Sequence, residues 1–291
     1  RDMAQRLLVE SKDLSIVPEL EKLVVSEHAL GQLHALWTLE GLGITSPKTY
    51  LSALHTTDPK VAQTALRLAA AMSNAQPEIR KEIEDYITNS YDNADPVLQL
   101  QMVLSSDALN KETAFDILKK FLVKYDQNPV ARDVVMSSLN NKEYAFFKNL
   151  MSDGTWKTYD QNREIFVEML VSAIAAKGAE EEITPVLNKL NTTENQETEW
   201  VTNAIINGIL NSTAIRDEAK IELTERPLIF QNGNSGDDLD GNLLANLEKL
   251  FIWPGKPIEI VDSKENLIEI DQIVLASGRQ KYLNLCANCH G

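Results

Sequence analysis

Asp58-Pro59-Lys60-Val61 opens the stretch that decides the fold, residues 58–72. Its apolar side chains follow the spacing i, i+4, i+7, i+8 and i+11, which places them on one face of a helix. These positions are Val61, Ala65, Leu68, Ala69 and Met72. The aspartate oxygen can accept hydrogen bonds from the free N–H groups of the first turn, and proline suits the first helical position. The stretch therefore predicts a helix that begins next to Pro59 and has one apolar face to bury.

The same helix start recurs in Asp95-Pro96-Val97 and Asn128-Pro129-Val130. The first residues of the three starts, at positions 58, 95 and 128, are 37 and 33 residues apart. Ser46-Pro47 and Thr184-Pro185 are weaker versions. A repeat of this length is typical of helical solenoids, in which each unit is a helix pair that shares its core with its neighbours. The Asx-Pro starts resemble HEAT repeats more than the 34-residue tetratricopeptide type.

Three further segments repeat the apolar stripe, while the alternation typical of strands is nearly absent before residue 212. Their apolar positions are Ala114, Ile117, Leu118, Phe121, Leu122 and Tyr125; Phe166, Met169, Ala173 and Ile174; and Val201, Ala204, Ile205 and Ile209. We therefore predict an all-α fold for residues 3–212. The expected architecture is a HEAT-like α-solenoid, a superhelix of about six antiparallel helix pairs.

The chain is acidic, with 28 basic against 43 acidic residues and a net charge of −15. Nucleic acid is an unlikely class of partner for such a surface, because proteins bind the phosphate backbone through Lys and Arg. The sequence also has no apolar run of the roughly 18 residues that a membrane span needs. The composition therefore favours a well-solvated helical protein.

Both cysteines of the chain lie in its last six residues, Cys286-Ala287-Asn288-Cys289-His290-Gly291. This Cys-x-x-Cys-His spacing is the one used to attach a c-type haem. Each thiol can form a thioether with one vinyl group of the porphyrin, and the adjacent histidine can bind the iron. We therefore predict Cys286 and Cys289 as haem-binding residues and His290 as the iron ligand.

Other readings of the cysteine pair stay open, namely a zinc half-site, a redox dithiol or a chance spacing. Zinc needs four ligands, and the other histidines, His28, His34 and His55, lie far upstream. A thioredoxin-like dithiol would follow a βαβ pattern, which the sequence does not show. Residues 273–285 read as a helix, and Gly278-x3-Tyr282-x3-Cys286 resembles the opening helix of a class I cytochrome c.

Two stretches near the start of the chain, residues 1–10 and 33–43, carry a wider resemblance together with the haem motif. They resemble large secreted bacterial proteins, found in Planctomycetes and Bacteroidetes, that combine a β-propeller of the sugar-dehydrogenase type, HEAT repeats and a cytochrome c. This resemblance implies a HEAT-like domain over 1–212, a connector over 213–271, and the first helix and haem motif of a cytochrome c over 272–291.

The same resemblance implies a longer parent chain and its location. A propeller-type dehydrogenase module would precede this segment and the rest of the cytochrome would follow it, so we expect the chain to be part of a longer polypeptide. Haem c would be attached in the matured full-length protein and absent from this segment made alone. Covalent attachment implies maturation in the periplasm, the cell envelope or outside the cell.

Several other features have simpler structural interpretations. His34, Trp37 and Glu40 can share one helix flank, but we expect Trp37 in the core and His34 as a hydrogen-bond partner between repeats. Residues 180–182, three glutamates, suit the positive end of a helix. The methionines at 102, 136, 151 and 169 are expected to fill gaps in the core rather than bind iron.

The connector contains a polar, glycine-rich loop at 231–241. Its acid spacing does not match an EF-hand, and a calcium site there stays open. A short helix over 243–251, a turn at Trp253-Pro254-Gly255 and an extended segment around Ile258 and Ile260 are expected to follow.

Two functions follow from these observations. In the first, the chain is a non-catalytic scaffold and electron-transfer junction of a larger dehydrogenase-like cytochrome. The sequence shows no catalytic constellation of its own, so any enzymatic activity would belong to the parent. In the second, it is a protein-interaction solenoid in which the cysteine pair is incidental or forms a disulfide.

Overall fold

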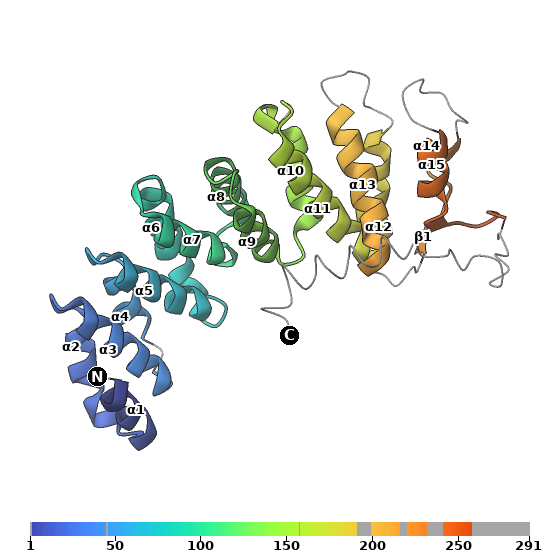
Figure 1. Cartoon of the computed structure of the whole chain (residues 1–291). Coiled ribbons are helices and arrows are strands. Elements are labelled where there is room, and N and C mark those ends of the chain that lie inside the picture. Colours follow the sequence, from blue (N-terminus) through green and yellow to red (C-terminus); the bar gives the residue numbers. More distant parts are fainter. Residues whose placement is uncertain are drawn as a thin grey trace, which may run out of the picture. The chain divides into compact units, whose positions relative to one another are not determined.

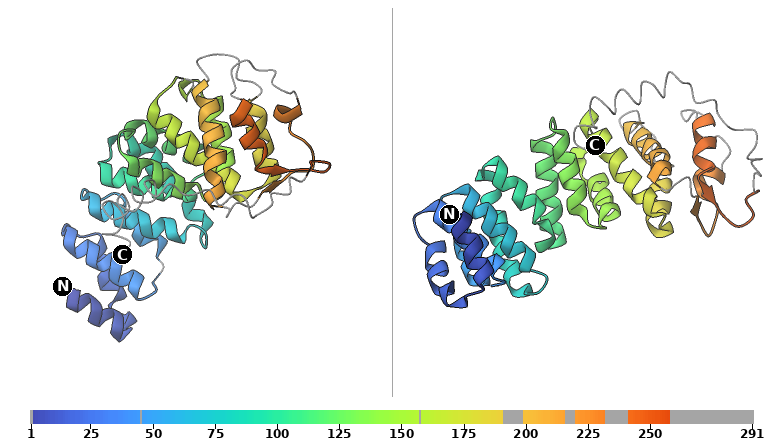
Figure 2. Two further views of the ribbon diagram at one scale, coloured as in Figure 1. Left: turned by 45° about the vertical axis from the view of Figure 1, so that its right-hand side comes forward. Right: turned by 60° about the horizontal axis from the view of Figure 1, so that its bottom comes forward.

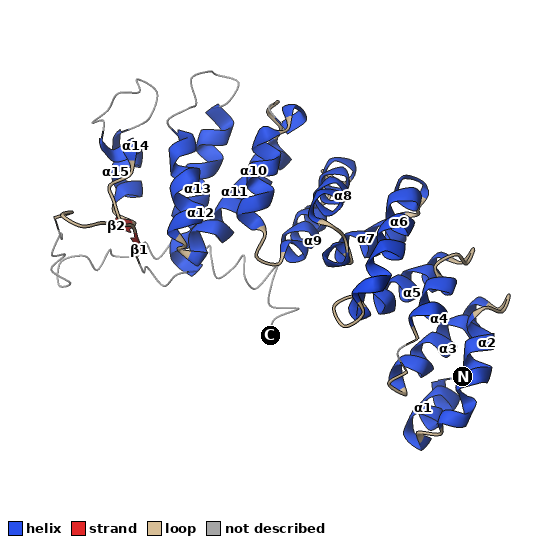
Figure 3. Cartoon of the chain, turned by 180° about the vertical axis from the view of Figure 1, so that it is seen from behind, coloured by secondary structure: helices blue, strands red, loops and turns tan. Residues whose placement is uncertain are grey.

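The computed structural model describes residues 2–44, 46–156, 158–190, 199–215, 220–231 and 241–257. Within these ranges the chain is mostly helical, with two strands of two residues each (Figure 3). The α-helices are α1 (Asp2–Ser11), α2 (Val17–Val24), α3 (Ala29–Gly41), α4 (Pro47–Ala53), α5 (Pro59–Met72), α6 (Arg80–Ser90), α7 (Pro96–Leu104), α8 (Lys111–Lys124), α9 (Pro129–Leu139), α10 (Glu143–Ser152), α11 (Gln161–Lys177), α12 (Glu180–Lys189), α13 (Glu199–Ile215), α14 (Leu228–Gln231) and α15 (Gly241–Glu248). The all-α prediction is confirmed.

Short 3-10 helices and two strands complete the described elements. The 3-10 helices are η1 (Leu14–Ile16), η2 (Pro77–Ile79), η3 (Tyr91–Asn93), η4 (Ser106–Ala108) and η5 (Gly154–Trp156). The strands are β1 (Ile221–Glu222) and β2 (Phe251–Ile252), which pair in parallel with Ile221 opposite Phe251.

The three predicted Asx-Pro helix starts are confirmed. Helices α5, α7 and α9 begin at Pro59, Pro96 and Pro129. The side chains of Asp58, Asp95 and Asn128 each accept a hydrogen bond, of 2.9, 2.9 and 3.1 Å, from the N–H group two residues further on. Each cap thus pairs a first-turn N–H that the helix itself leaves without a partner.

The two weaker starts have different outcomes. Helix α4 does begin at Pro47, but the Ser46 hydroxyl bonds to the Thr49 hydroxyl rather than to a backbone N–H. The prediction of a start at Thr184-Pro185 is wrong, because Pro185 lies inside α12, which begins at Glu180. The run of glutamates in the first turn favours this earlier start through the helix dipole.

Helices pack mainly against helices that are close in sequence (Figure 1). Helix α3 contacts α1, α2 and α5, and α5 contacts α4 and α7. The pattern continues with α7 against α8 and α9, and with α11 against α10, α12 and α13. Figure 2 shows α10, α11 and α13 next to one another from two further directions.

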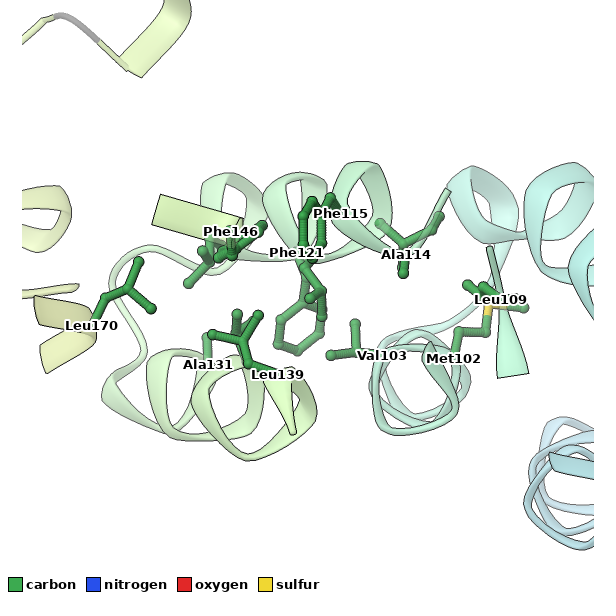
Figure 4. Packing of buried hydrophobic residues seen from close by; sticks show 14 of the residues in the cluster. Met102, Val103, Leu109, Ala114, Phe115, Phe121, Ala131, Leu139, Phe146 and Leu170 are labelled. Carbon is green, nitrogen blue, oxygen red and sulfur yellow. The ribbon is translucent and has the colours of Figure 1, made fainter. Parts of the chain in front are cut away.

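The buried apolar side chains form one cluster that extends from Leu20 to Phe251. Figure 4 shows its middle, where Phe121 of α8 lies near Val103 of α7 and Ala131 of α9. The predicted stripe of α5 is buried as expected, and so is that of α13. In α11, however, Met169 and Ala173 are only half-buried, because α11 buries Val167, Leu170 and Val171 as well. The prediction for that helix therefore placed two of its four positions, Met169 and Ala173, on the wrong flank of the buried face.

The segment before residue 254 ends in a small aromatic cluster. Phe230 stacks on Trp253, with ring centroids 5.8 Å apart, and the Phe251 ring lies 5.9 Å from Phe230. The expected helix over 243–251 is too long, since α15 ends at Glu248 and Phe251 pairs in β2. Gly255 has a φ of +83°, which fits the expected turn.

The chain divides into two compact units, residues 1–253 and 254–291. Only residues 254–257 of the second unit are described. The expected loop at 232–240 and the expected extended segment from Ile258 lie outside the described residues.

We predict that Gly208→Ala destabilises the protein by about 1–3 kcal/mol, the range for overpacking a core. A Cβ atom at Gly208 would lie 2.6 Å from the carbonyl oxygen of Glu168 and 2.8 Å from Cβ of Val171, so α13 and α11 would have to move apart. Urea unfolding measures the loss. Gly154→Ala is the control, because a Cβ there meets nothing within 4 Å. Equal stability of the two variants would contradict this close helix crossing.

Candidate functional site

The predicted haem residues, Cys286, Cys289 and His290, lie outside the described residues, as does the expected helix at 273–285. Their prediction therefore stays a prediction. The described ranges do include the other candidates from the sequence analysis, which are His34, Trp37, Glu40, residues 180–182 and the methionines at 102, 136, 151 and 169.

His34, Trp37 and Glu40 of α3 do not converge on a common site. The His34 ring nitrogen Nδ1 is 2.7 Å from the side-chain oxygen of Gln5 in α1, so the expected hydrogen bond between neighbouring helices is confirmed. Glu40 is exposed. The three side chains thus serve different contacts.

Trp37 is only half-buried, which corrects the expectation of a core tryptophan. It packs at the edge of the apolar cluster, and the guanidinium of Arg67 in α5 lies 5.5 Å from its ring centroid. A cation over an indole ring is favourable even where water is present.

The glutamates at the start of α12 do occupy its first turn. The Glu180 carboxylate accepts hydrogen bonds from both the N–H and the hydroxyl of Thr224, each at 2.6 Å. These bonds lower the pKa of Glu180. Glu182 pairs with Lys177 at 3.7 Å. This group therefore joins α12 to the segment after β1 in addition to favouring the helix start.

The expectation that the methionines fill the core holds for one of the four. Met102 is fully buried, and Met136, Met151 and Met169 are half-buried. No three His, Cys, Asp or Glu side chains within the described ranges are placed to hold one metal ion. None of the described helices is both long and apolar enough to span a bilayer.

The most site-like feature is a groove of about 540 Å³ beside α8, which the sequence analysis missed and which we call the α8 groove. Its volume lies within the range of ligand sites, roughly 300–1,000 Å³. Its basic lining residues are Lys119, Lys120 and Lys124, and its apolar or aromatic ones are Tyr91, Val123 and Trp156. Tyr91 comes from η3, Trp156 from η5 and the other four from α8. The groove thus gathers segments that are far apart in the sequence.

Lys119 lies at one side of the α8 groove, where two aspartates hold it in place. Its ammonium group lies 3.0 Å from Asp153 and 3.2 Å from Asp116, and its side chain is 17% exposed. Burial disfavours the charged lysine, but the hydrogen bonds to the two carboxylates outweigh this and raise the pKa of Lys119.

Asp153 is held by three donors. One carboxylate oxygen accepts from the hydroxyl of Thr155 at 2.7 Å and from its N–H at 3.0 Å, and the other accepts from Lys119. Hydrogen bonds from the Thr155 side chain first, and from Lys119 next, lower the pKa of Asp153 from 3.8 to about 2. The Asp153 carboxylate therefore stays ionised at physiological pH.

Lys120 and Lys124 are more exposed. Lys120 lies 3.2 Å from both oxygens of Asp92 and 5.9 Å from the centroid of the Tyr91 ring. Lys124 donates to the buried Gln99 side-chain oxygen at 2.9 Å, and Gln99 in turn donates to the Tyr91 carbonyl at 2.6 Å. Lys124 has no carboxylate at ion-pair distance in the part of the chain that the structure describes.

Comparisons with known proteins add no relative to this picture. No family model, curated protein or solved structure matches the chain.

We predict that Thr155→Val raises the pKa of Asp153 towards its ordinary value, because the variant keeps the backbone N–H and removes the hydroxyl. A carboxyl NMR titration measures this. Since the folded pKa is below the unfolded one, the stability that Asp153 contributes is present above pH ~4 and is lost as pH falls from about 4 to about 2.

Asp153→Asn should accordingly be less stable than wild type at neutral pH, with the difference shrinking below pH ~4. An unchanged Asp153 pKa in Thr155→Val would show that the hydroxyl bond does not hold the carboxylate.

Proposed function

We propose that this chain is the scaffold and electron-transfer junction of a larger secreted c-type cytochrome with a dehydrogenase-like parent. In this proposal residues 1–212 form a HEAT-like α-solenoid, residues 213–271 connect, and residues 272–291 begin a cytochrome c domain. Haem c is attached to Cys286 and Cys289, with His290 on the iron. The sequence Cys286-x2-Cys289-His290 is the observation that carries the proposal.

The helical part supports a scaffold role. Contacts run from each helix to helices a few positions away, and the apolar cluster continues from the first pairs to the last. In repeat proteins this pattern makes stability approximately a sum of the stabilities of the repeats and of the interfaces between neighbours. A scaffold of this kind can hold two redox modules at a set distance.

The haem would supply one-electron chemistry, and the residues of this chain would attach it and bind its iron. Electrons would pass from the propeller-type dehydrogenase module of the same parent to the haem and then onward. Covalent attachment needs the export-linked maturation machinery, so the proposal places the protein in the periplasm, the cell envelope or outside the cell.

The test uses the full protein that contains this chain, exported in a host with c-type haem maturation. We expect the peptide with residues 286–290 to be heavier by one haem in mass spectrometry. Replacing both cysteines by alanine should abolish this adduct, and His290→Ala should keep the thioethers but change the iron spectrum. The same chain made in the cytoplasm should carry no haem.

Two outcomes would contradict the haem reading. A peptide without added mass in the exported wild type would do so, and a peptide lighter by two hydrogens would identify a disulfide instead. In either case the second function, a protein-interaction array, becomes the better account. The α8 groove is the observation that favours this second function.

A further inference from the structure

Helix α1 packs on α3 through one of its sides. The side-chain oxygen of Gln5 lies 2.7 Å from Nδ1 of His34. One turn further on, Val9 fits closely against Gly41, where an added Cβ atom would lie 2.8 Å from a methyl carbon of Val9. Gln5 and Val9 therefore mark the side of α1 that α3 covers.

The opposite side of α1 is apolar as well, but it is exposed. Successive residues of an α-helix are turned by about 100°, so residues two apart point in nearly opposite directions. Met3 and Leu7 each lie two residues before a residue that faces α3, and they are 64% and 57% exposed. Ala4 and Ser11 are exposed on the same side, which carries no charged residue. We call these four residues the outer face of α1.

The charged residues of α1 form a separate stripe between these two sides. Asp2, Arg6 and Glu10 follow the spacing i, i+4 and i+8, and Arg6 pairs with Glu10 at 2.7 Å. A helix turns such a stripe to water and buries its apolar surface. Helix α5 shows the complete arrangement, because α3 and α7 cover two of its sides while its charged residues, Lys60 and Arg67, are exposed. Helix α1 thus has the side-chain pattern of a helix that is covered on two sides.

We propose that a helix preceding α1 in the same polypeptide covers the outer face of α1 in the complete protein. Helices α1, α3, α5, α7 and α9 contact one another in series, and the outer face continues this series on the free side of α1 (Figure 1). The covering helix packs an apolar stripe on Met3 and Leu7 and comes close over Ala4 and Ser11, whose side chains are small. This inference rests on the longer polypeptide of the proposed function but not on the haem.

The size of the outer face favours a covalently joined helix over a separate molecule. Two side chains such as Met3 and Leu7 offer roughly 100–250 Å² of apolar surface. Stable complexes between separate molecules bury about 800 Å² on each partner. A helix in the same polypeptide is held near α1 at a high effective concentration, so it needs much less surface. A second copy of the chain does not find enough surface on this face.

Oxidation of Met3 by hydrogen peroxide tests the proposal, because an accessible methionine is converted to its sulfoxide. The rate is compared between the chain of residues 1–291 and the complete protein, by mass spectrometry of the tryptic peptide 2–6. We expect Met3 to oxidise at least tenfold more slowly in the complete protein. Met136 of α9, half-buried, is the internal control and should oxidise equally fast in both. Both cysteines are replaced by alanine throughout, so haem attachment does not affect the result.

Variants then locate the contact. Leu7→Asp places a charge in the covered face, so Met3 of the complete protein should oxidise as fast as it does in the chain of residues 1–291. Leu104→Asp is the matched control, because it makes the same change at a 49% exposed position of α7 and should leave Met3 protected. When the residues before Arg1 are restored in steps, protection should appear with the first one or two helices, within about 20–45 residues.

Four results would overturn the proposal. Equal oxidation of Met3 in the two proteins would show that the outer face stays uncovered, and protection that survives Leu7→Asp would place the contact elsewhere. Protection that the chain of residues 1–291 acquires as its concentration rises would assign the face to a second copy. Protection that is lost when the residues after Gly291 are removed would assign it to the downstream module. Thermal melts of each variant separate a lost contact from a lost fold.

Discussion

The structure depends on helices that are covered by neighbours on more than one side. Helix α11 packs against α10, α12 and α13, and α5 packs against α3, α4 and α7. Such helices cannot bury their apolar surface alone, so each one stabilises the next and is stabilised by it. Gly208 shows how tight this mutual packing is, since even a methyl group there would meet the backbone of the facing helix.

Polar groups at the helix ends determine where the packed helices begin, and they also form part of the α8 groove. Asp58, Asp95 and Asn128 fix where helices begin. Asp92 in η3 and Asp153 just before η5 pair with lysines of α8. The groove is therefore a consequence of how successive helices are joined.

The sequence predicted those features of the fold that depend only on residues close together in the chain. The starts at Pro59, Pro96 and Pro129 follow from a cap and a fixed φ, which need no distant residue. Pro185 was placed wrongly because the glutamates of the first turn let α12 begin earlier, and Phe251 because it pairs with β1. Trp37 was placed too deep in the core. The α8 groove could not be predicted, since it joins Asp92, Lys120 and Asp153 across many intervening residues. The three lysines at 119, 120 and 124 of one predicted helix were a signal that the sequence did contain. Which acidic residues face them could not be read from the sequence.

The visible spectrum of the exported full protein tests the proposed electron-transfer role most directly. The account predicts a red protein whose c-type haem bands sharpen on reduction with dithionite and return on oxidation with ferricyanide, and whose colour survives acid–acetone extraction. The reversible change would show that the iron cycles between two states, and the resistance to extraction would show that the haem is covalently bound. A colourless protein, or colour lost to the solvent, would contradict it.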